Sequence, residues 1–160
     1  MSMVEIHNSV AKIYEENKET LEIFECLDEF SDTQNFCDHY GFDIEDSCNA
    51  ILIKSKKPKV FYSMFCVLGA NRLDVNHKAK EAMGAKRVSF ASREEAEAVT
   101  GQIYGGISPL GLPENIKVYL DKNVTDREKL FIGAGNRVSK FFLSPETLID
   151  LSSAKVLDLT

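Results

Sequence analysis

The succession of strands along the chain most constrains how it can fold. Two apolar, β-favouring segments lie at residues 50–53 and 60–68, and Lys56-Lys57-Pro58 between them predicts a hairpin-like connection. Three more such segments follow one another later in the chain, at residues 116–121, 129–132 and 140–143. Uninterrupted strand-helix-strand winding cannot give these runs, so we expect a mixed or antiparallel sheet flanked by helices.

Helix signals separate the other strands. Amphipathic spacing and capping residues predict helices at residues 3–18, 33–41, 74–83, 92–101 and 145–151, with a helical turn at 43–47. Shorter strands are predicted at residues 21–27, 87–90 and 155–159. We find no repeat, linker or low-complexity tract, and therefore expect one α+β domain over residues 1–160, with an N-terminal helix at about 3–18 and a core over about 20–160.

Length and composition indicate a globular protein with its own core. The chain has 160 residues, of which 44% are hydrophobic and 28% charged, and about 100 to 200 residues is the usual size of one domain. Its longest apolar-rich run, residues 60–68, is far shorter than the ~20 residues that cross a bilayer. The first 17 residues lack the apolar block of a signal peptide, so we expect a cytoplasmic protein without a membrane partner.

Charge is distributed unevenly along the chain. The net charge is −6, but residues 1–50 carry −11, residues 51–100 carry +5 and the last sixty are neutral. Lys and Arg supply the affinity for phosphate backbones, so the acidic total excludes general binding of DNA or other nucleic acid. The basic middle third either forms one local patch or consists of ordinary solvated charges.

The cysteines and histidines do not indicate a metal site. The four cysteines are 11, 11 and 18 residues apart with no Cys-x-x-Cys pair, and the three histidines are equally scattered. Reduced, mostly buried thiols are the expected state in a chain without secretory features. We predict neither a metal nor a cofactor.

A glycine- and proline-rich loop at residues 101–113 is the segment most indicative of function. Four glycines and two prolines make it too long and too constrained for a simple connection. Exposed backbone N–H groups in such a loop can hold a carbonyl or phosphate oxygen; the alternative is a merely tight surface loop. It lacks the Gly-Lys-Ser/Thr of a phosphate loop, and Ser108 lacks the second glycine of a nucleophile elbow.

Residues 99–111, Val-Thr-Gly-Gln-Ile-Tyr-Gly-Gly-Ile-Ser-Pro-Leu-Gly, resemble the central motif of the YbaK/ProX family, free-standing relatives of the prolyl-tRNA synthetase editing domain. Segments in matching order support the resemblance from about residue 20 to 160: 32–33, 72–76, 83–88, 91–97, 131–137 and 143–148. The resemblance implies a curved, barrel-like, mostly antiparallel mixed sheet wrapped by helices. It also implies hydrolysis of the ester of mischarged tRNA.

The resemblance also assigns roles to residues. Backbone groups of a Gly-x-x-x-Pro loop hold the substrate carbonyl and terminal adenosine in this family, which here implies Gly105, Gly106, Ile107, Ser108 and Pro109. A second segment would form the opposite wall of the pocket: Gly133, Ala134 and Gly135. No protein nucleophile is required, since water or a substrate group attacks the ester while backbone amides stabilise the oxyanion.

One position departs from the family pattern. Asn49 stands where many members carry a lysine that contacts the terminal phosphate and positions the ester. Asparagine supplies two hydrogen-bond donors but no charge, and Lys54 lies on the opposite face of the same strand. Three consequences stay open: an editing branch that uses Asn49, a changed substrate, or a pocket that binds without hydrolysing.

We therefore expect a trans-editing aminoacyl-tRNA deacylase in which Asn49, Gly105 and Gly106 are catalytic, acting on tRNA for proline that carries a small non-cognate amino acid. Its expected partners are the aminoacyl-tRNA acceptor end and prolyl-tRNA synthetase. The expected tRNA contacts are Lys54, Lys56, Arg72 and Lys78. The alternatives are a non-catalytic module that binds charged tRNA ends or a synthetase, and a hydrolase of small aminoacyl esters.

Overall fold

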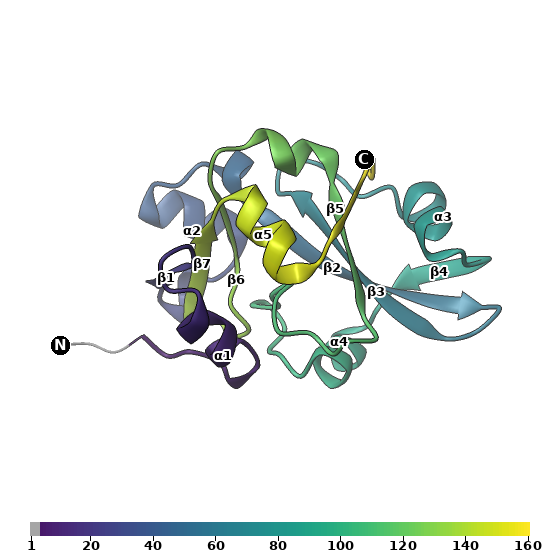
Figure 1. Ribbon diagram of the computed structural model, residues 1–160, viewed down its shortest axis with the longest axis horizontal. Helices are drawn as coiled ribbons and strands as arrows, with labels where there is room; N and C mark the ends of the chain where they lie inside the picture. Colours follow the sequence, from purple (N-terminus) through teal and green to yellow (C-terminus); the bar gives the residue numbers. More distant parts are fainter. Residues whose placement is uncertain (1–3) are drawn as a thin grey trace.

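The computed structural model describes residues 4–160 and contains the predicted order of five helices and eight strands in this part of the chain (Figure 1). The helices are α1 (Asn8–Glu16), α2 (Thr33–Tyr40), α3 (Lys80–Met83), α4 (Arg93–Thr100) and α5 (Pro145–Ser152). The strands are β1 (Glu22–Glu25), β2 (Cys48–Lys57), β3 (Phe61–Leu68), β4 (Arg87–Phe90), β5 (Lys117–Asp121), β6 (Leu130–Gly133), β7 (Ser139–Leu143) and β8 (Lys155–Leu157). No helix among the described residues is long and apolar enough to cross a membrane.

Capping residues begin and end α2 and α4 where the sequence indicates, whereas the helix predicted at about 3–18 is shorter: α1 begins at Asn8, with His7 as its N-cap, and ends at Glu16. Asp32 accepts hydrogen bonds from two backbone amides at the start of α2, and Gly41 ends that helix in a left-handed conformation. The capping box of Ser92 and Glu95 is formed at the start of α4. The predicted helix 74–83 differs in that it begins with a π-helical turn, Val75–Ala79, before α3.

The strands form two sheets instead of the single barrel-like sheet we expected. One is antiparallel with the order β1-β7-β6, and the other is mixed with the order β4-β2-β3-β5-β8. Between the two sheets, the described residues form a single isolated bridge, Ser47 with Phe131. The sheets over residues 4–160 therefore do not close into a barrel. The expected class is confirmed: a mixed sheet arrangement, antiparallel in four of its six pairings and flanked by helices.

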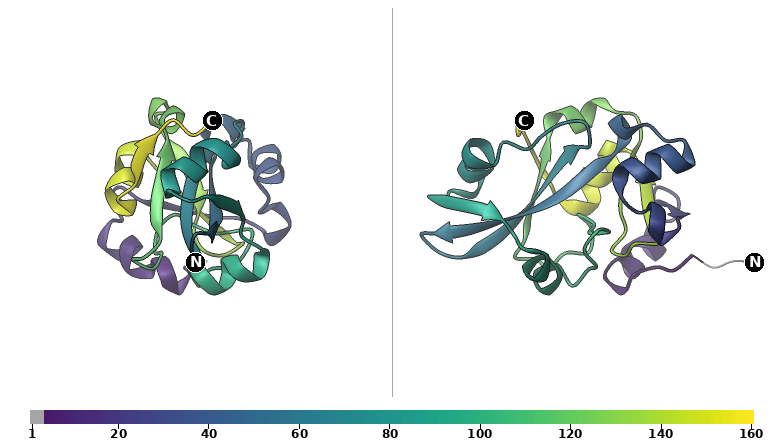
Figure 2. Two further views of the ribbon diagram at one scale, coloured as in Figure 1. Left: turned by 90° about the vertical axis from the view of Figure 1, so that its right-hand side faces the viewer. Right: turned by 180° about the vertical axis from the view of Figure 1, so that it is seen from behind.

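The β2–β3 hairpin is longer than the sequence indicated. We expected strand structure to stop near residue 53, but β2 continues to Lys57 because its backbone pairs with β3 on one side and β4 on the other. Figures 1 and 2 show the hairpin and β4 projecting from the end of the molecule opposite the N-terminus.

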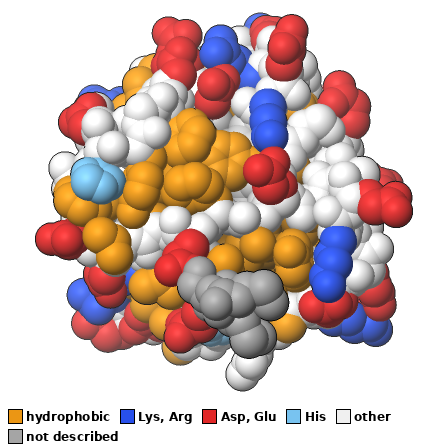
Figure 3. Space-filling view, turned by 90° about the vertical axis from the view of Figure 1, so that its left-hand side faces the viewer, with side chains coloured by type: hydrophobic (Ala, Val, Ile, Leu, Met, Phe, Trp, Pro, Cys, Tyr) orange, Lys and Arg blue, Asp and Glu red, His pale blue; other side chains and the backbone are white. Residues whose placement is uncertain are grey.

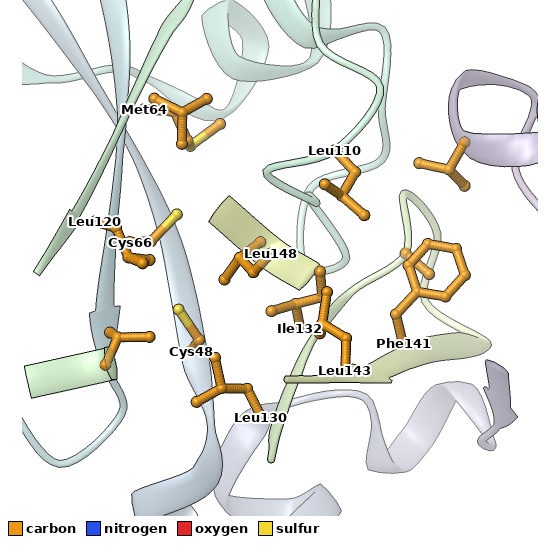
Figure 4. Close-up of a cluster of buried hydrophobic side chains, with 14 of the residues drawn as sticks. Cys48, Met64, Cys66, Leu110, Leu120, Leu130, Ile132, Phe141, Leu143 and Leu148 are labelled. Carbon is orange, nitrogen blue, oxygen red and sulfur yellow. The ribbon is translucent and has the colours of Figure 1, made fainter. Parts of the chain in front are cut away.

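The main core fills the space between the two sheets beneath α5. Cys48 and Met64 from the mixed sheet face Ile132 and Leu143 from the other sheet, with Leu148 of α5 between them (Figure 4). A separate aromatic cluster packs between α2 and the antiparallel sheet: Phe24, Phe36, Tyr40, Phe42, Phe131 and Phe142. The four cysteines are buried free thiols, as expected.

Candidate functional site

A cavity of about 580 Å³ opens where β2 of one sheet meets β6 of the other. Its lining comes from five segments: the start of α2, the start of β2, the first residue of α4, the loop after α4, and the β6–β7 hairpin. The lining residues are Ser31, Asp32, Thr33, Ser47, Cys48, Asn49, Ala50, Arg93, Tyr104, Gly105, Gly106, Ile107, Phe131, Ile132, Gly133, Arg137 and Lys140. Five of the predicted site residues are among them: Asn49, Gly105, Gly106, Ile107 and Gly133.

The buried side chain of Gln102 fixes the conformation of the glycine-rich loop by two hydrogen bonds to its backbone. Its Nε2 donates to the carbonyl oxygen of Leu110 at 2.9 Å, and its Oε1 accepts from the amide of Ser108 at 2.6 Å. The hydroxyl of Ser108 accepts from the amide of Leu110 at 3.1 Å. Ser108 is fully buried and does not line the cavity, so its hydroxyl supports the loop from behind.

Only part of the loop backbone is available to a ligand. The amide of Gly106 donates to the carbonyl oxygen of Ile103 at 3.0 Å, and that of Ser108 is held by Gln102. Within residues 4–160, the amides of Gly105 and Ile107 have no hydrogen-bond partner. Among the loop residues that line the cavity, Gly105 and Ile107, and not Gly106, therefore supply the free backbone donors.

The second glycine segment packs directly against the loop and does not form the opposite wall that we expected. The amide of Ile103 donates to the carbonyl oxygen of Gly135 at 2.9 Å, and the amide of Gly135 donates to the carbonyl oxygen of Gly106 at 2.7 Å. A Cβ added to Gly133 would lie 2.5 Å from the carbonyl oxygen of Ile107. Glycine at position 133 thus permits this close backbone contact.

Asn49 lies at the start of β2 with its side chain tied to neighbouring hydroxyl groups. Its Oδ1 accepts from Ser47 Oγ at 3.1 Å and from Thr33 Oγ1 at 3.3 Å. The Nδ2 group has no partner among the described residues, which leaves both of its N–H groups available. Asn49 can therefore donate hydrogen bonds to a ligand from a fixed position.

Lys140 is the most unusual lining residue, and the sequence reasoning missed it. It is only 6% exposed, and its Nζ donates to the carbonyl oxygen of Ser31 at 3.0 Å. Burial lowers the pKa of its ammonium group from the ordinary 10.5. Strand alternation was the available signal, because it places Lys140 on the same face as Phe142 in a predicted strand.

Two arginines add to the positive charge of the cavity. Arg137 pairs with Asp28 at 2.8 Å, and Arg93 lies 5.6 Å from the centre of the Tyr104 ring. Asp32, which caps α2, is the lining carboxylate. Three basic side chains and one acidic side chain favour an anionic ligand, although the chain as a whole is acidic.

The remaining predicted site residues lie outside the lining. Pro109 is buried behind the loop, and Ala134 and Gly135 are buried beside it. The expected tRNA contacts lie elsewhere: Lys54 pairs with Glu95 at 2.7 Å, Lys78 pairs with Asp158 at 3.0 Å, and Lys56 and Arg72 are exposed.

Comparison with known proteins assigns this site to a family. Residues 28–151 match the model of the aminoacyl-tRNA editing domain. The chain is 32% identical over 92 residues to a protein of Enterococcus faecalis named "Putative Cys-tRNA(Pro)/Cys-tRNA(Cys) deacylase EbsC", covering 58% of this chain and 56% of that protein. It is 36% identical over 107 residues to the proline–tRNA ligase of Nautilia profundicola, covering 59% of this chain and 18% of the ligase.

A solved structure shares the fold. It is described as a "putative trans-editing enzyme for prolyl tRNA synthetase", aligns with a TM-score of 0.81 and is 22% identical, covering 98% of this chain and 99% of that one. At this identity the likeness concerns the fold alone.

Proposed function

The chain belongs to the aminoacyl-tRNA editing domain family, and we propose that it hydrolyses the ester bond between a wrongly attached amino acid and its tRNA. The names of its relatives, a Cys-tRNA(Pro)/Cys-tRNA(Cys) deacylase and prolyl-tRNA ligases, support tRNA for proline as the substrate class. They also support a small amino acid, cysteine among the candidates, and prolyl-tRNA synthetase as a partner.

The observation that carries the proposal is the pair of free amides beside a cation-lined cavity. Gly105 and Ile107 present N–H groups without partners in the described chain, and such donors stabilise the oxyanion of a tetrahedral intermediate. The cavity volume of about 580 Å³ lies within the usual range of roughly 300–1,000 Å³ for small-molecule sites, which suits an aminoacylated terminal adenosine.

The reaction needs no covalent bond to the protein. The oxygen of a water molecule attacks the ester carbonyl carbon, and the carbonyl electrons move onto its oxygen, which the amides hold. The intermediate then expels the ribose oxygen, which takes up the proton that the attacking water loses, and the free amino acid and tRNA leave. The buried hydroxyl of Ser108, behind the loop, takes no part.

A separate basic surface supports contact with the body of the tRNA. The β2–β3 hairpin and β4 bring together Lys56, Lys57, Lys59, Lys86 and Arg87, and none of them forms an ion pair within residues 4–160. Lys56 lies seven positions after Asn49 on β2, a distance of about 23 Å at ~3.3 Å per residue.

Acidic side chains outnumber basic ones at the opposite end of the molecule. Figure 3 shows them around the margin of an apolar surface, with several lysines or arginines among them. Repulsion from this end and attraction to the hairpin would orient the acceptor stem along β2.

The test is a deacylation panel. Purified protein is incubated with tRNA for proline carrying proline, alanine, cysteine or serine, and loss of the aminoacyl group is followed over time. We expect hydrolysis of at least one mischarged species and sparing of the proline ester. No release from any of them would reject the proposal.

The second candidate is a non-catalytic module, favoured by Asn49 in place of the lysine of many family members. It would bind a non-hydrolysable aminoacyl-adenosine mimic without deacylating any charged tRNA. Affinity without turnover would therefore select this reading.

A further inference from the structure

Lys140 is a charged residue within an aromatic surface. On the antiparallel sheet it pairs with Phe24 of β1 on one side and Gly133 of β6 on the other. Directly opposed residues project from the same face, where Phe36 of α2 also packs. Because Gly133 has no side chain, the loop backbone at Gly106 and Ile107 comes close to this face of the sheet. Lys140 itself lines the cavity.

The ammonium group of Lys140 lacks a compensating anion. Among the described residues it forms no ion pair with a carboxylate, and its contacts are the Ser31 carbonyl oxygen at 3.0 Å and the Phe36 ring at 5.0 Å. An ammonium group has three donors, and lysine is almost never buried without pairing. The energetic cost of this arrangement indicates a ligand that supplies negative charge.

Two connections link Lys140 to the free amides of the loop. Ser31, which accepts the lysine hydrogen bond, donates from its own hydroxyl to the carbonyl oxygen of Gly105 at 3.3 Å. Gly133, which pairs with Lys140 in the sheet, lies against the carbonyl oxygens of Gly106 and Ile107. Through Ser31 and Gly133, the lysine is therefore linked indirectly to both ends of the Gly105–Ile107 segment.

We propose that Lys140 is a catalytic residue whose ammonium group, together with the amides of Gly105 and Ile107, stabilises the negative oxygen that forms on the ester carbonyl during hydrolysis. This inference rests on the proposed function. It assigns the positive charge of the site to β7, on the sheet that does not contain Asn49. The exposed Arg93 at the cavity and the basic β2–β3 hairpin are then available to bind phosphate groups of the tRNA.

The experiment compares Lys140→Met with Lys140→Arg on the best mischarged tRNA and on the same amino acid esterified to adenosine without a phosphate. We expect Lys140→Met to lower kcat about 100-fold or more on both substrates, with KM changed less than about threefold. Lys140→Arg, which keeps the charge, should recover part of the loss. The control is Lys129→Met, an exposed lysine whose Nζ lies 5.6 Å from the Phe142 ring.

Stability gives a second readout that separates catalysis from folding. Replacing a buried, uncompensated cation with an apolar side chain of similar length should raise the Tm of Lys140→Met. A rise in Tm with a loss of kcat supports the proposal, whereas a lower Tm with a matching loss of activity would indicate a structural lysine and overturn it.

Two further outcomes would reject the assignment. Unchanged kcat in Lys140→Met would remove the lysine from catalysis. A loss confined to KM and absent with the phosphate-free ester would make Lys140 a phosphate contact instead. Wild-type protein that is inactive on every mischarged tRNA would reject the proposed function itself, together with this inference.

Discussion

Lys140 Nζ lies 3.0 Å from the carbonyl oxygen of Ser31, a residue 109 positions earlier in the chain. The Ser31 hydroxyl in turn donates to Gly105, and Thr33, two residues later, donates to Asn49. Residues 31–33, at the start of α2, thus form hydrogen bonds with three parts of one cavity lining: Lys140, the glycine-rich loop at Gly105, and Asn49.

Gly133→Ala should inactivate the protein by displacing the loop. The added Cβ would lie 2.5 Å from the Ile107 carbonyl oxygen and 2.7 Å from that of Gly106, both backbone atoms. We expect kcat to fall on the order of 100-fold, because small displacements of reacting groups have effects of this size. Gly84→Ala is the control for strain without a clash: its Cβ would meet nothing within 4 Å, its φ of +63° makes alanine strained there, and it lies outside the cavity lining. Wild-type kcat in Gly133→Ala would show that loop position is unimportant.

Ser108→Ala should destabilise the protein but leave hydrolysis largely intact. The Ser108 hydroxyl accepts from the buried amide of Leu110, and losing that acceptor costs about 1–3 kcal/mol. The measurements are urea unfolding and single-turnover deacylation at a temperature where both proteins are folded. Abolished turnover in a folded variant would argue for a serine nucleophile, against the mechanism proposed above.

Asn49→Ala should reduce kcat/KM about tenfold, the equivalent of about 1.4 kcal/mol, through loss of the Nδ2 donors. It also leaves the hydroxyls of Thr33 and Ser47 without their acceptor. Asn123→Ala is a matched control, because Asn123 bonds to Thr160 and does not line the cavity. Full activity of Asn49→Ala on the best substrate would show that Asn49 has no role in hydrolysis.

Asn49→Lys tests whether Lys140 or a lysine at position 49 is the better source of positive charge in the site. If Lys140 provides the cation, a second lysine in the same cavity adds repulsion, and we expect activity at or below the wild-type level. A gain of tenfold or more would mean instead that the site lacks a cation at position 49. The deacylation panel described above measures either result.

Substituting Lys56 and Lys59 by glutamine should weaken binding of full-length aminoacyl-tRNA without altering hydrolysis of a phosphate-free aminoacyl-adenosine ester. Each lost phosphate contact should reduce the slope of log K against log salt by about 1. Lys12→Gln on α1 is the control, because Lys12 pairs with Glu16 and lies far from the hairpin in sequence. An unchanged salt slope in the double variant would exclude the hairpin from tRNA binding.

Glu95 should make the protein sensitive to acid between pH 4.5 and about 2. Hydrogen bonds, first from Lys54 and then from Ser92 and Tyr62, lower the pKa of Glu95 from 4.5 to about 2. The unfolded chain therefore binds the proton first as the pH falls, so this contribution to stability is complete above pH 4.5 and is lost by about pH 2.

The measurement is Tm against pH for the wild type and Glu95→Gln. The slope between pH 4.5 and 2 should be smaller in the variant. Glu94→Gln is the control, since the neighbouring Glu94 is exposed and forms no ion pair within residues 4–160. Identical slopes in wild type and Glu95→Gln would contradict the prediction.

Local sequence signals were sufficient for the order of helices and strands, for the caps at Asp32 and Ser92, and for the glycine-rich loop. These features depend on residues within a few positions of one another, so periodicity and capping chemistry predict them. The resemblance of residues 99–111 to a known motif was enough to identify the family.

Only the tertiary structure decided the composition of the cavity. The division into two sheets, the position of Lys140 beside Ser31, and the contact of Gly133 with the loop each join segments far apart in sequence. The sequence alone could show that Lys140 shares a strand face with Phe142. It could not show that the opposed residue is Gly133, which lets the loop backbone approach the face that carries the lysine, because that depends on the register of β6 against β7.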